Sequence, residues 1–337
     1  MRLTATALRH AFAEQLQRKP PVRRTAEPAD LADGGVPDPV ARAMDAVSCE
    51  IARVGEPACA AAPARAAWSA LVTICRGRPE CPPLFCVHGA GGSVLNFRTI
   101  SDRLGARQPC YGLQAQGIDG HRPPLTAIES MAAQYVDAIR SAQPDGPYRL
   151  LGYSAGGVIA FEMAQQLKRA GAQIALLAMI DTLAPDASDC RISVFRKIWL
   201  ARQWTLQYAV QWPARRRNFH LGKAASAAAL AKVARGEPLS PELTDLYLVH
   251  NFDAAQRRYR PDHYDGSMLL FKAEQANLDV LNAGRSLGWA AHIRGDIRVV
   301  SVAGAHLSIM SGPGLAQVVE ELRKELARPE VERPLRR

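Results

Sequence analysis

The 337-residue sequence has no uninterrupted apolar run approaching the ~20 residues that a membrane-spanning helix needs. Arg9, His10 and Glu14 interrupt the N-terminal stretch, which therefore lacks the apolar centre of a signal peptide. The seven cysteines are an odd number, lie far apart and include no CxxC pair, which argues against a disulfide scaffold and against a zinc site. We therefore expect a cytoplasmic protein with reduced cysteines and no bound metal.

Acidic residues are absent from residues 190–236, which contain ten Lys or Arg. The rest of the chain has 32 basic and 32 acidic residues, so the net charge of +10 belongs to this one segment. The segment could form solvated helices over a core, dock an acidic protein through Arg215, Arg216 and Arg217, or lie on a membrane surface. Because no recognisable nucleic-acid-binding fold accompanies the charge, we do not expect a nucleic-acid partner.

The chain divides by composition into three parts. Residues 1–65 are expected to form an extension with short helices at 4–17 and 38–54, joined by a mobile linker rich in Pro and Gly. Residues 66–328 are long enough to form one folded domain with a large core. Residues 329–337 are expected to be a disordered tail.

Short apolar runs alternate with stretches of helical periodicity from about residue 70 onward. Helices are expected in 126–142 and 155–170. This alternation predicts an α/β fold with a mostly parallel central sheet and helices on both faces. The runs expected to be strands are Leu71–Cys75, Leu84–Val87, Tyr148–Leu151, Ile174–Ile180, Met268–Phe271 and Ile297–Val302.

Residues 183–258 interrupt the alternation, because the helices expected at 192–210, 224–235 and 241–258 have no strand between them. We interpret this segment as a helical lid inserted over the sheet edge, a place where substrate selectivity commonly resides. The aromatic candidates for substrate or lid contacts are Trp199, Trp204 and Tyr208.

The pentapeptide Gly152-Tyr153-Ser154-Ala155-Gly156 lies between an expected strand and an expected helix. A sharp strand–turn–helix elbow holds a nucleophilic serine in a strained conformation, so that Ser154 Oγ projects at the edge of the sheet. The flanking glycines are needed because a Cβ at either position would collide with the neighbouring strand and helix. The motif thus points to Ser154 as a nucleophile.

A serine hydroxyl needs a base that is itself oriented by a carboxylate, and in such folds the order along the chain is Ser, Asp, His. Asp181 ends the run Ile174–Ile180 and is the best candidate for the acid, ahead of Asp186 and Asp189. His306 follows the last expected strand through the flexible turn Ala303-Gly304-Ala305 and is the best candidate for the base. The competing histidines are His10, His88, His121, His220, His250, His263 and His292.

An oxyanion hole needs two preorganised N–H donors. We expect one from the backbone of Ala155, directly after the nucleophile. The second is expected from Ala90 in the loop His88-Gly89-Ala90-Gly91-Gly92, where small residues allow a substrate carbonyl to approach. This loop lacks the Lys-Ser/Thr of a P-loop and the GxGxxG spacing, so we do not interpret it as a phosphate site.

These motifs together resemble the thioesterase domains of nonribosomal peptide and polyketide synthetases, a branch of the α/β-hydrolases. The resemblance covers about residues 70–325. Its matching strings are PPLFCVHGAGG (82–92), YRLLGYSAGG (148–157), LLAMIDT (176–182), RYRPDHYDGSMLLFKA (258–273), GW (288–289) and VAGAHLSIM (302–310).

The resemblance implies that an acyl or peptidyl chain passes from the phosphopantetheine thiol of an acyl or peptidyl carrier protein to Ser154 and is released by hydrolysis or cyclisation. It implies no metal or organic cofactor. No serine in the chain follows an Asp or His, as the modified serine of a carrier does. We therefore expect either that the protein acts in trans on a separate carrier or that its N-terminal extension docks to one. The alternatives are a free-standing carboxylesterase or editing thioesterase, and a catalytically retired module that docks a carrier.

Overall fold

A computed structural model defines residues 68–187, 223–275 and 283–328 of the chain. These residues form one seven-stranded sheet with the strand order β1-β3-β2-β4-β5-β6-β7. The strands are β1 (Leu71–Cys75), β2 (Leu84–Val87), β3 (Cys110–Leu113), β4 (Tyr148–Tyr153), β5 (Ile174–Ile180), β6 (Met268–Gln275) and β7 (Ile297–Ala305).

The sheet is mostly parallel. β1 runs antiparallel to β3, and every other neighbouring pair is parallel. Parallel neighbours need crossover connections, which place the carboxyl ends of β2 and β4 to β7 at the same edge of the sheet. The labelled helices of the described residues are α3 (Asn96–Leu104), α4 (Ile128–Ala142), α5 (Ala155–Arg169), α7 (Pro241–Arg258), the short η3 (Trp289–Ala291) and α8 (Gly314–Leu326).

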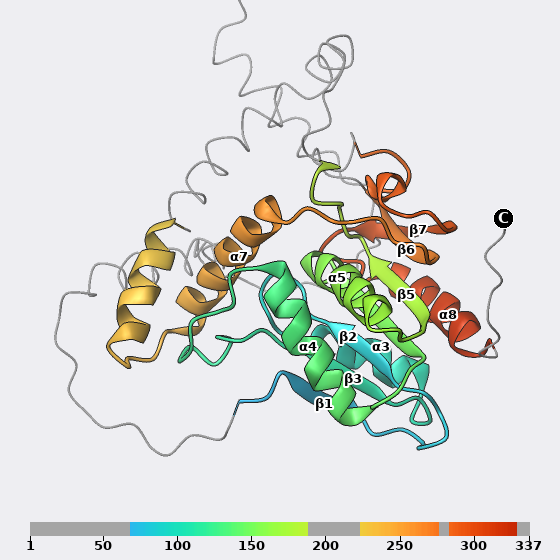
Figure 1. Ribbon diagram of the computed structural model, residues 1–337, viewed down its shortest axis with the longest axis horizontal. Coiled ribbons are helices and arrows are strands. Elements are labelled where there is room, and N and C mark those ends of the chain that lie inside the picture. The colour runs from blue at the N-terminus through green and yellow to red at the C-terminus, as the bar shows by residue number, and fades with distance from the viewer. Residues whose placement is uncertain (1–67, 188–222, 276–282, 329–337) are drawn as a thin grey trace, which may run out of the picture. The chain divides into compact units, whose positions relative to one another are not determined.

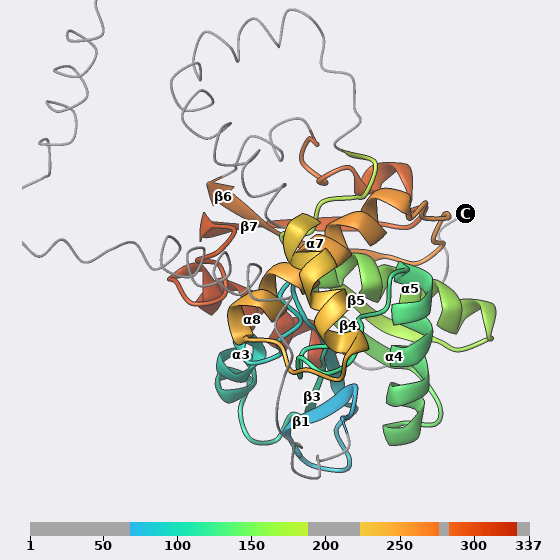
Figure 2. The same ribbon diagram turned by 90° about the vertical axis from the view of Figure 1, so that its left-hand side faces the viewer.

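Helices cover both faces of the sheet. α4 and α5 lie side by side on one face, and α3 and α8 lie on the other (Figures 1 and 2). The expected α/β arrangement is therefore confirmed.

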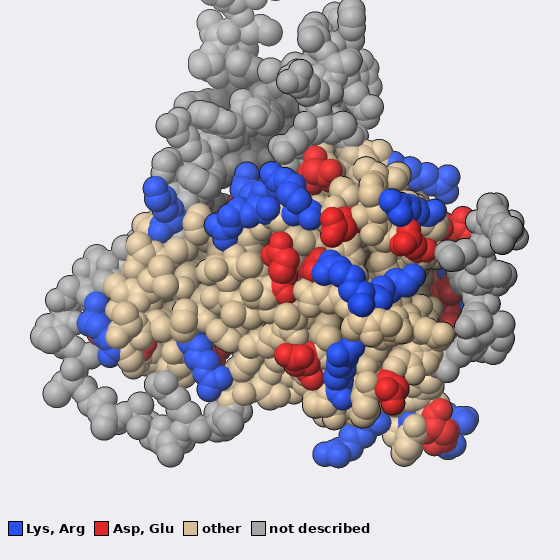
Figure 3. Space-filling model, in the orientation of Figure 1, with Lys and Arg blue, Asp and Glu red and all other residues tan. Residues whose placement is uncertain are grey.

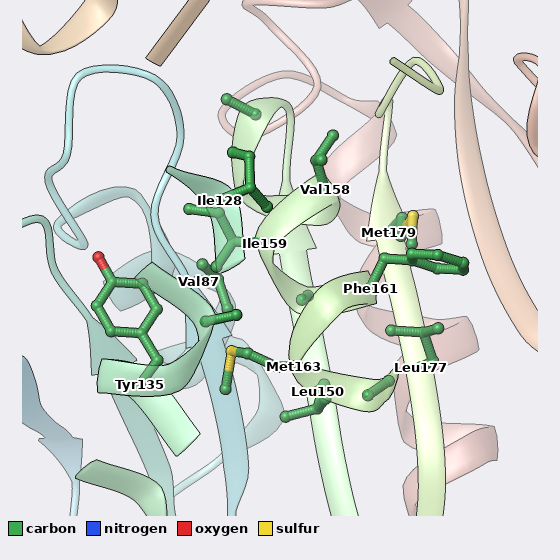
Figure 4. Close-up of a cluster of buried hydrophobic side chains, with 14 of the residues drawn as sticks. Val87, Ile128, Tyr135, Leu150, Val158, Ile159, Phe161, Met163, Leu177 and Met179 are labelled. Atoms are coloured by element: carbon green, nitrogen blue, oxygen red, sulfur yellow. The ribbon is translucent and has the colours of Figure 1, made fainter. Parts of the chain in front are cut away.

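The helix after the elbow, α5, is buried on almost all sides. It packs on the sheet with one side and against α4 with another, so its sequence AGGVIAFEMA is apolar around the helix. Figure 4 shows Ile159, Phe161 and Met163 of this helix among side chains of the neighbouring strands and of α4. A helix that is packed this closely gives the serine at its N-terminus a fixed position.

The pattern of the sequence did not predict one strand, and it predicted others too short. β3 consists of CYGL, which is short and contains a glycine and no β-branched residue, so nothing in its pattern indicated a strand. β7 continues to Ala305, so the expected turn Ala303-Gly304-Ala305 belongs to the strand instead. Its pairing with β6 shifts register between Ala273 and Gln275, and Gly304 takes a φ of 110° there.

The end of the inserted segment is helical, as expected. A helix spans residues 223–234, and α7 matches the expected range 241–258. The side chain of Ser240 caps α7 by accepting a hydrogen bond from the Leu243 N–H at 3.2 Å. Phe252 packs into the main core, whereas Tyr247 packs with the helix 223–234. Helix α7 therefore connects the inserted segment to the main core.

The described part of the chain contains no helix with the length and apolar character needed to cross a membrane. Nor do the described residues include a cluster of three or more His, Cys, Asp or Glu side chains that could hold a metal ion. The four described cysteines are free thiols. Burial raises the pKa of the Cys86 thiol, and it raises the pKa of Cys110 to about 11. Both thiols are therefore protonated near neutral pH and are weak nucleophiles.

Phe161→Ala tests the core beneath the elbow. Phe161 is fully buried and packs against the rings of Trp289 and Tyr264. Truncation leaves a cavity, so we expect the free energy of unfolding to fall by about 3–5 kcal/mol, measured by urea denaturation. Leu230→Ala, at a side chain that is 51% exposed, should change it by less than about 0.5 kcal/mol. Equal losses in the two variants would contradict this account of the core.

Candidate active site

Ser154 lies between the last residue of β4 and the first residue of α5. Its φ of 53° and ψ of −122° are disfavoured for a residue with a Cβ, as a strained elbow requires. Three hydrogen bonds hold this backbone: Ser154 N–H donates to Ile180 O at 2.8 Å, and Ser154 O accepts from Gly157 N–H at 3.1 Å and from Thr182 Oγ1 at 2.8 Å. The expected strand–turn–helix geometry is confirmed.

Glycines allow the elbow to pack against its neighbours. A Cβ on Gly156 would overlap the carbonyl oxygen of His88, at the end of β2. A Cβ on Gly157 would overlap the side chain of Thr182, and one on Gly152 would overlap the Gly157 backbone. The predicted collisions are thus present, and they explain why this turn needs glycine on both sides of the serine.

Three candidate side chains that are far apart in the sequence meet at the carboxyl edge of the sheet. Ser154 Oγ lies 2.9 Å from His306 Nε2, and His306 Nδ1 lies 2.8 Å from Asp181 Oδ2. With the ring neutral, Nδ1–H donates to the carboxylate and Nε2 accepts from the hydroxyl. This arrangement allows His306 to take the serine proton while Asp181 holds the ring in the required tautomer.

Asp181 is fixed by its own backbone and side chain. Its side chain is only 3% exposed, whereas the imidazole of His306 is 32% exposed. Asp181 N–H donates to Phe271 O at 2.7 Å, and its second carboxylate oxygen, Oδ1, accepts from Ala273 N–H at 3.0 Å. Both oxygens therefore have a donor, and the carboxylate cannot turn away from His306 without losing one of them.

The loop after β2 forms a tight turn beside the serine. Gly92 N–H donates to Gly89 O at 2.9 Å and closes the turn. The N–H groups of Ala90 and Ala155 donate to no other residue in the described ranges. Ala155 also begins α5, where the helix dipole favours negative charge. The oxyanion role expected for these two N–H groups stays a prediction.

Asp186 and His292, weaker candidates for the acid and the base, form a pair of their own. His292 Nε2 lies 3.0 Å from Asp186 Oδ1, so these two side chains bind each other. The pair ties the segment after Asp181 to the loop that contains Trp289, whose Nε1–H donates to Thr182 O at 2.8 Å. This arrangement fits a structural role, and the structure brings neither residue to Ser154.

Part of the chain matches a known protein family. The family model of the thioesterase domain matches residues 82–191. The chain is 30% identical over 253 residues to the malpinin synthetase of Mortierella alpina, covering 72% of this chain and 3% of the relative. It is 40% identical over 122 residues to the dimodular nonribosomal peptide synthase of Bacillus subtilis (strain 168), covering 34% of this chain and 5% of the relative. Residues 82–191 belong to the thioesterase domain family.

Solved structures extend the likeness to the whole described fold. A four-domain nonribosomal peptide synthetase bound to AMP and glycine matches with a TM-score of 0.56 and 27% identity, over 77% of this chain and 20% of its own. The NocB thioesterase domain matches with a TM-score of 0.53 and 23% identity, over 77% of this chain and 99% of its own. The described residues therefore have the α/β-hydrolase fold, as expected. The chain spans only a few per cent of the two synthetases compared by sequence.

His88, a competing histidine in the sequence, supports the oxyanion loop of the thioesterase domain. It is buried; its Nδ1 contacts the carbonyl oxygen of Gly89, and its Nε2 lies 2.7 Å from the Tyr135 hydroxyl. Burial lowers the pKa of His88 to about 4, against a smaller opposing effect of the Gly89 hydrogen bond. The ring is therefore neutral near pH 7, and it braces the loop that carries Ala90.

Several candidates lie outside the described residues. They are the lid aromatics Trp199, Trp204 and Tyr208, the basic residues Arg215, Arg216 and Arg217, and the alternative acid Asp189.

On the face of the described residues seen in Figure 3, Lys and Arg side chains are interspersed with Asp and Glu. This mixture agrees with the balanced charge of the sequence outside residues 190–236.

Asp181→Asn tests the acid. The amide keeps the size of the side chain but loses the charge that favours imidazolium and the Nδ1–H tautomer. We expect the rate of Ser154 labelling by a fluorophosphonate to fall by about 10²–10⁴-fold. Asp186→Asn, in the same loop but bound to His292, is the matched control and should label at close to the wild-type rate. The reverse order of the two rates would assign the acid to Asp186.

His88→Gln tests the buried neutral ring. The unfolded chain binds this proton near pH 6.5 and the folded protein only near pH 4, so acidification across this interval favours unfolding. We expect this site to lower the free energy of unfolding by about 3 kcal/mol as the pH falls through the interval. Urea denaturation at several pH values should show that His88→Gln removes this part of the pH dependence, while the exposed control His263→Gln keeps it. An unchanged slope in His88→Gln would show that the ring is already charged when folded.

Proposed function

We propose that this thioesterase domain releases an acyl or peptidyl chain from the phosphopantetheine thioester of a carrier protein, through an acyl-enzyme at Ser154. The observation that carries the proposal is the continuous hydrogen-bonded chain from Ser154 through His306 to Asp181. The family of residues 82–191 supports thioester chemistry.

In the first half-reaction, His306 Nε2 removes the Ser154 proton as Oγ attacks the thioester carbonyl carbon. The carbonyl oxygen becomes an oxyanion, which accepts hydrogen bonds from the N–H groups of Ala90 and Ala155. The negative charge of Asp181 stabilises the imidazolium. The tetrahedral intermediate collapses by breaking its carbon–sulfur bond, and Nε2–H protonates the leaving thiolate. The carrier departs with a free thiol, and the chain remains as an ester on Oγ.

In the second half-reaction, His306 removes a proton from water, or from a hydroxyl or amine of the chain itself. The new nucleophile attacks the ester carbonyl, the same N–H groups hold the oxyanion, and Ser154 recovers its proton from Nε2. Water gives a free acid, and an internal nucleophile gives a lactone or a lactam. We propose that neither step uses a metal or organic cofactor.

The carrier partner is supported by the relatives, which are multidomain synthetases. We propose that Arg215, Arg216 and Arg217 attract an acidic carrier, a proposal that rests on the charge of residues 190–236 alone. We also propose, from the sequence alone, that the substrate contacts Trp199, Trp204 and Tyr208.

Ser154→Ala is the direct test of the acyl-enzyme. After incubation with an acyl-phosphopantetheinyl carrier, intact-mass spectrometry should show an added acyl group on the wild type and none on the variant. Turnover should fall by at least about 10³-fold. Ser141→Ala, at an exposed position of α4, is the matched control and should acylate normally. An acyl group that persists on the Ser154 variant would place the nucleophile elsewhere.

The same assay separates this function from that of a carboxylesterase. A carrier-dependent thioesterase should show a kcat/KM for the carrier-bound thioester well above that for short free oxyesters. Preference for free oxyesters would remove the carrier from the proposal and leave the Ser154 chemistry intact. An intact fold without turnover of either substrate would indicate a retired docking module.

A further inference from the structure

Tyr153, the residue before the nucleophile, contacts the base in two ways. Its ring is stacked on the imidazole of His306, with the ring centroids 5.5 Å apart and the planes inclined by 21°. Its hydroxyl donates a hydrogen bond to the backbone carbonyl of the same residue, His306 O, at 3.0 Å. Tyr153 is only 7% exposed, so the two contacts are shielded from water.

The stacking contact restrains a motion that the other hydrogen bonds permit. His306 bonds Ser154 through Nε2 and Asp181 through Nδ1, and both nitrogens form their hydrogen bonds outward in the plane of the ring. Neither bond contacts the face of the ring, so the pair resists tilting of the ring about the line between the two nitrogens only weakly. A flat neighbour against the face of the ring blocks this tilt, so the Tyr153 phenol supplies the missing restraint.

The hydroxyl contact restrains the backbone. His306 follows the last residue of β7, and its half-exposed side chain needs support from the chain on either side. On the far side, Ser308 Oγ accepts from Ala305 N–H at 2.9 Å and closes the turn. The Tyr153 hydroxyl fixes the His306 carbonyl within this turn, and so ties the end of β7 to the end of β4.

The Tyr153 hydroxyl keeps its proton throughout the working range of pH. Burial, with the nearby charge of Asp181, raises its pKa to about 12. The phenol therefore remains a hydrogen-bond donor, and its ring remains an uncharged π face. Such a face attracts a cation, so it favours the imidazolium form of His306.

We infer that Tyr153 is a positioning residue for His306, which holds the imidazole in line between Ser154 and Asp181 and stabilises its protonated form. This inference rests on the proposed acyl-enzyme mechanism but not on a thioester substrate, because any reaction that starts with proton transfer from Ser154 needs the same ring orientation. The groups that face the imidazole from the described elements are Ser154, Asp181 and Tyr153 itself.

The test uses a fluorophosphonate, which reports activation of Ser154 whatever the natural substrate is. Tyr153→Phe removes the hydroxyl and keeps the ring, and Tyr153→Leu removes both. Tyr148→Phe is the matched control, since Tyr148 begins the same strand, is fully buried and directs its hydroxyl to the carbonyls of Gln143 and Pro144. The labelling rate is measured from pH 5 to 9 on the full chain, with folding checked by circular dichroism.

We expect Tyr153→Phe to label several-fold more slowly with an unchanged pH midpoint, because the π face is retained. Tyr153→Leu should label at least tenfold more slowly, with the midpoint of the acidic limb lowered by about 0.5 pH unit, as loss of a weak cation–π contact predicts. Tyr148→Phe should keep the wild-type rate and midpoint.

Two outcomes would overturn the inference. One is a folded Tyr153→Leu variant that labels at the wild-type rate. The other is equal slowing of all three variants with no change in midpoint, as a purely structural loss would produce. If instead the labelling rates follow the expected order but the wild type does not turn over carrier thioesters, the proposed substrate fails and the role of Tyr153 stands.

Discussion

Register between parallel strands is the constraint on which the site depends. Tyr153 and Ile180 are paired across β4 and β5, so the next residues, Ser154 and Asp181, are neighbours at the edge of the sheet. His306 must reach them from β7, across the width of β6. The extension of β7 to Ala305, paired with Gln275, carries the chain far enough beyond the edge for the imidazole to turn back. A change of one residue in any of these registers would remove the alignment.

Strain at this edge is held by packing beneath it. Ser154 and Asp181 both have positive φ values, 53° and 48°, and each such residue costs about 1–3 kcal/mol. The buried helix α5 and the strand β5 determine these conformations from below, and backbone hydrogen bonds to Ile180 and Phe271 determine them from the side. The elbow is therefore held by the large, apolar core beneath it.

The sequence predicted which side chains meet at the sheet edge better than it predicted the elements around them. The positions after apolar runs identified Ser154, Asp181 and His306, because a parallel sheet gathers its strand ends at one edge and the side chains there must be polar to act. Strand β3 was missed since four residues with a central glycine have no periodicity to detect. The end of β7 was misjudged because alanine and glycine are typical of turns, and only the pairing with β6 makes them a strand.

Tyr153 could not be recognised from sequence for a different reason. The elbow geometry constrains the glycines and the serine but leaves the residue before the serine unspecified, and its contacts come from a loop about 150 residues away. In the fold, however, a Cβ on Gly89 would lie 3.1 Å from the Tyr153 ring, which in turn contacts His306. The oxyanion loop, the residue before the nucleophile and the base are thus packed in series. A larger residue at position 89 would press on the ring of Tyr153, so the small side chain there protects the contact between this ring and the imidazole of His306.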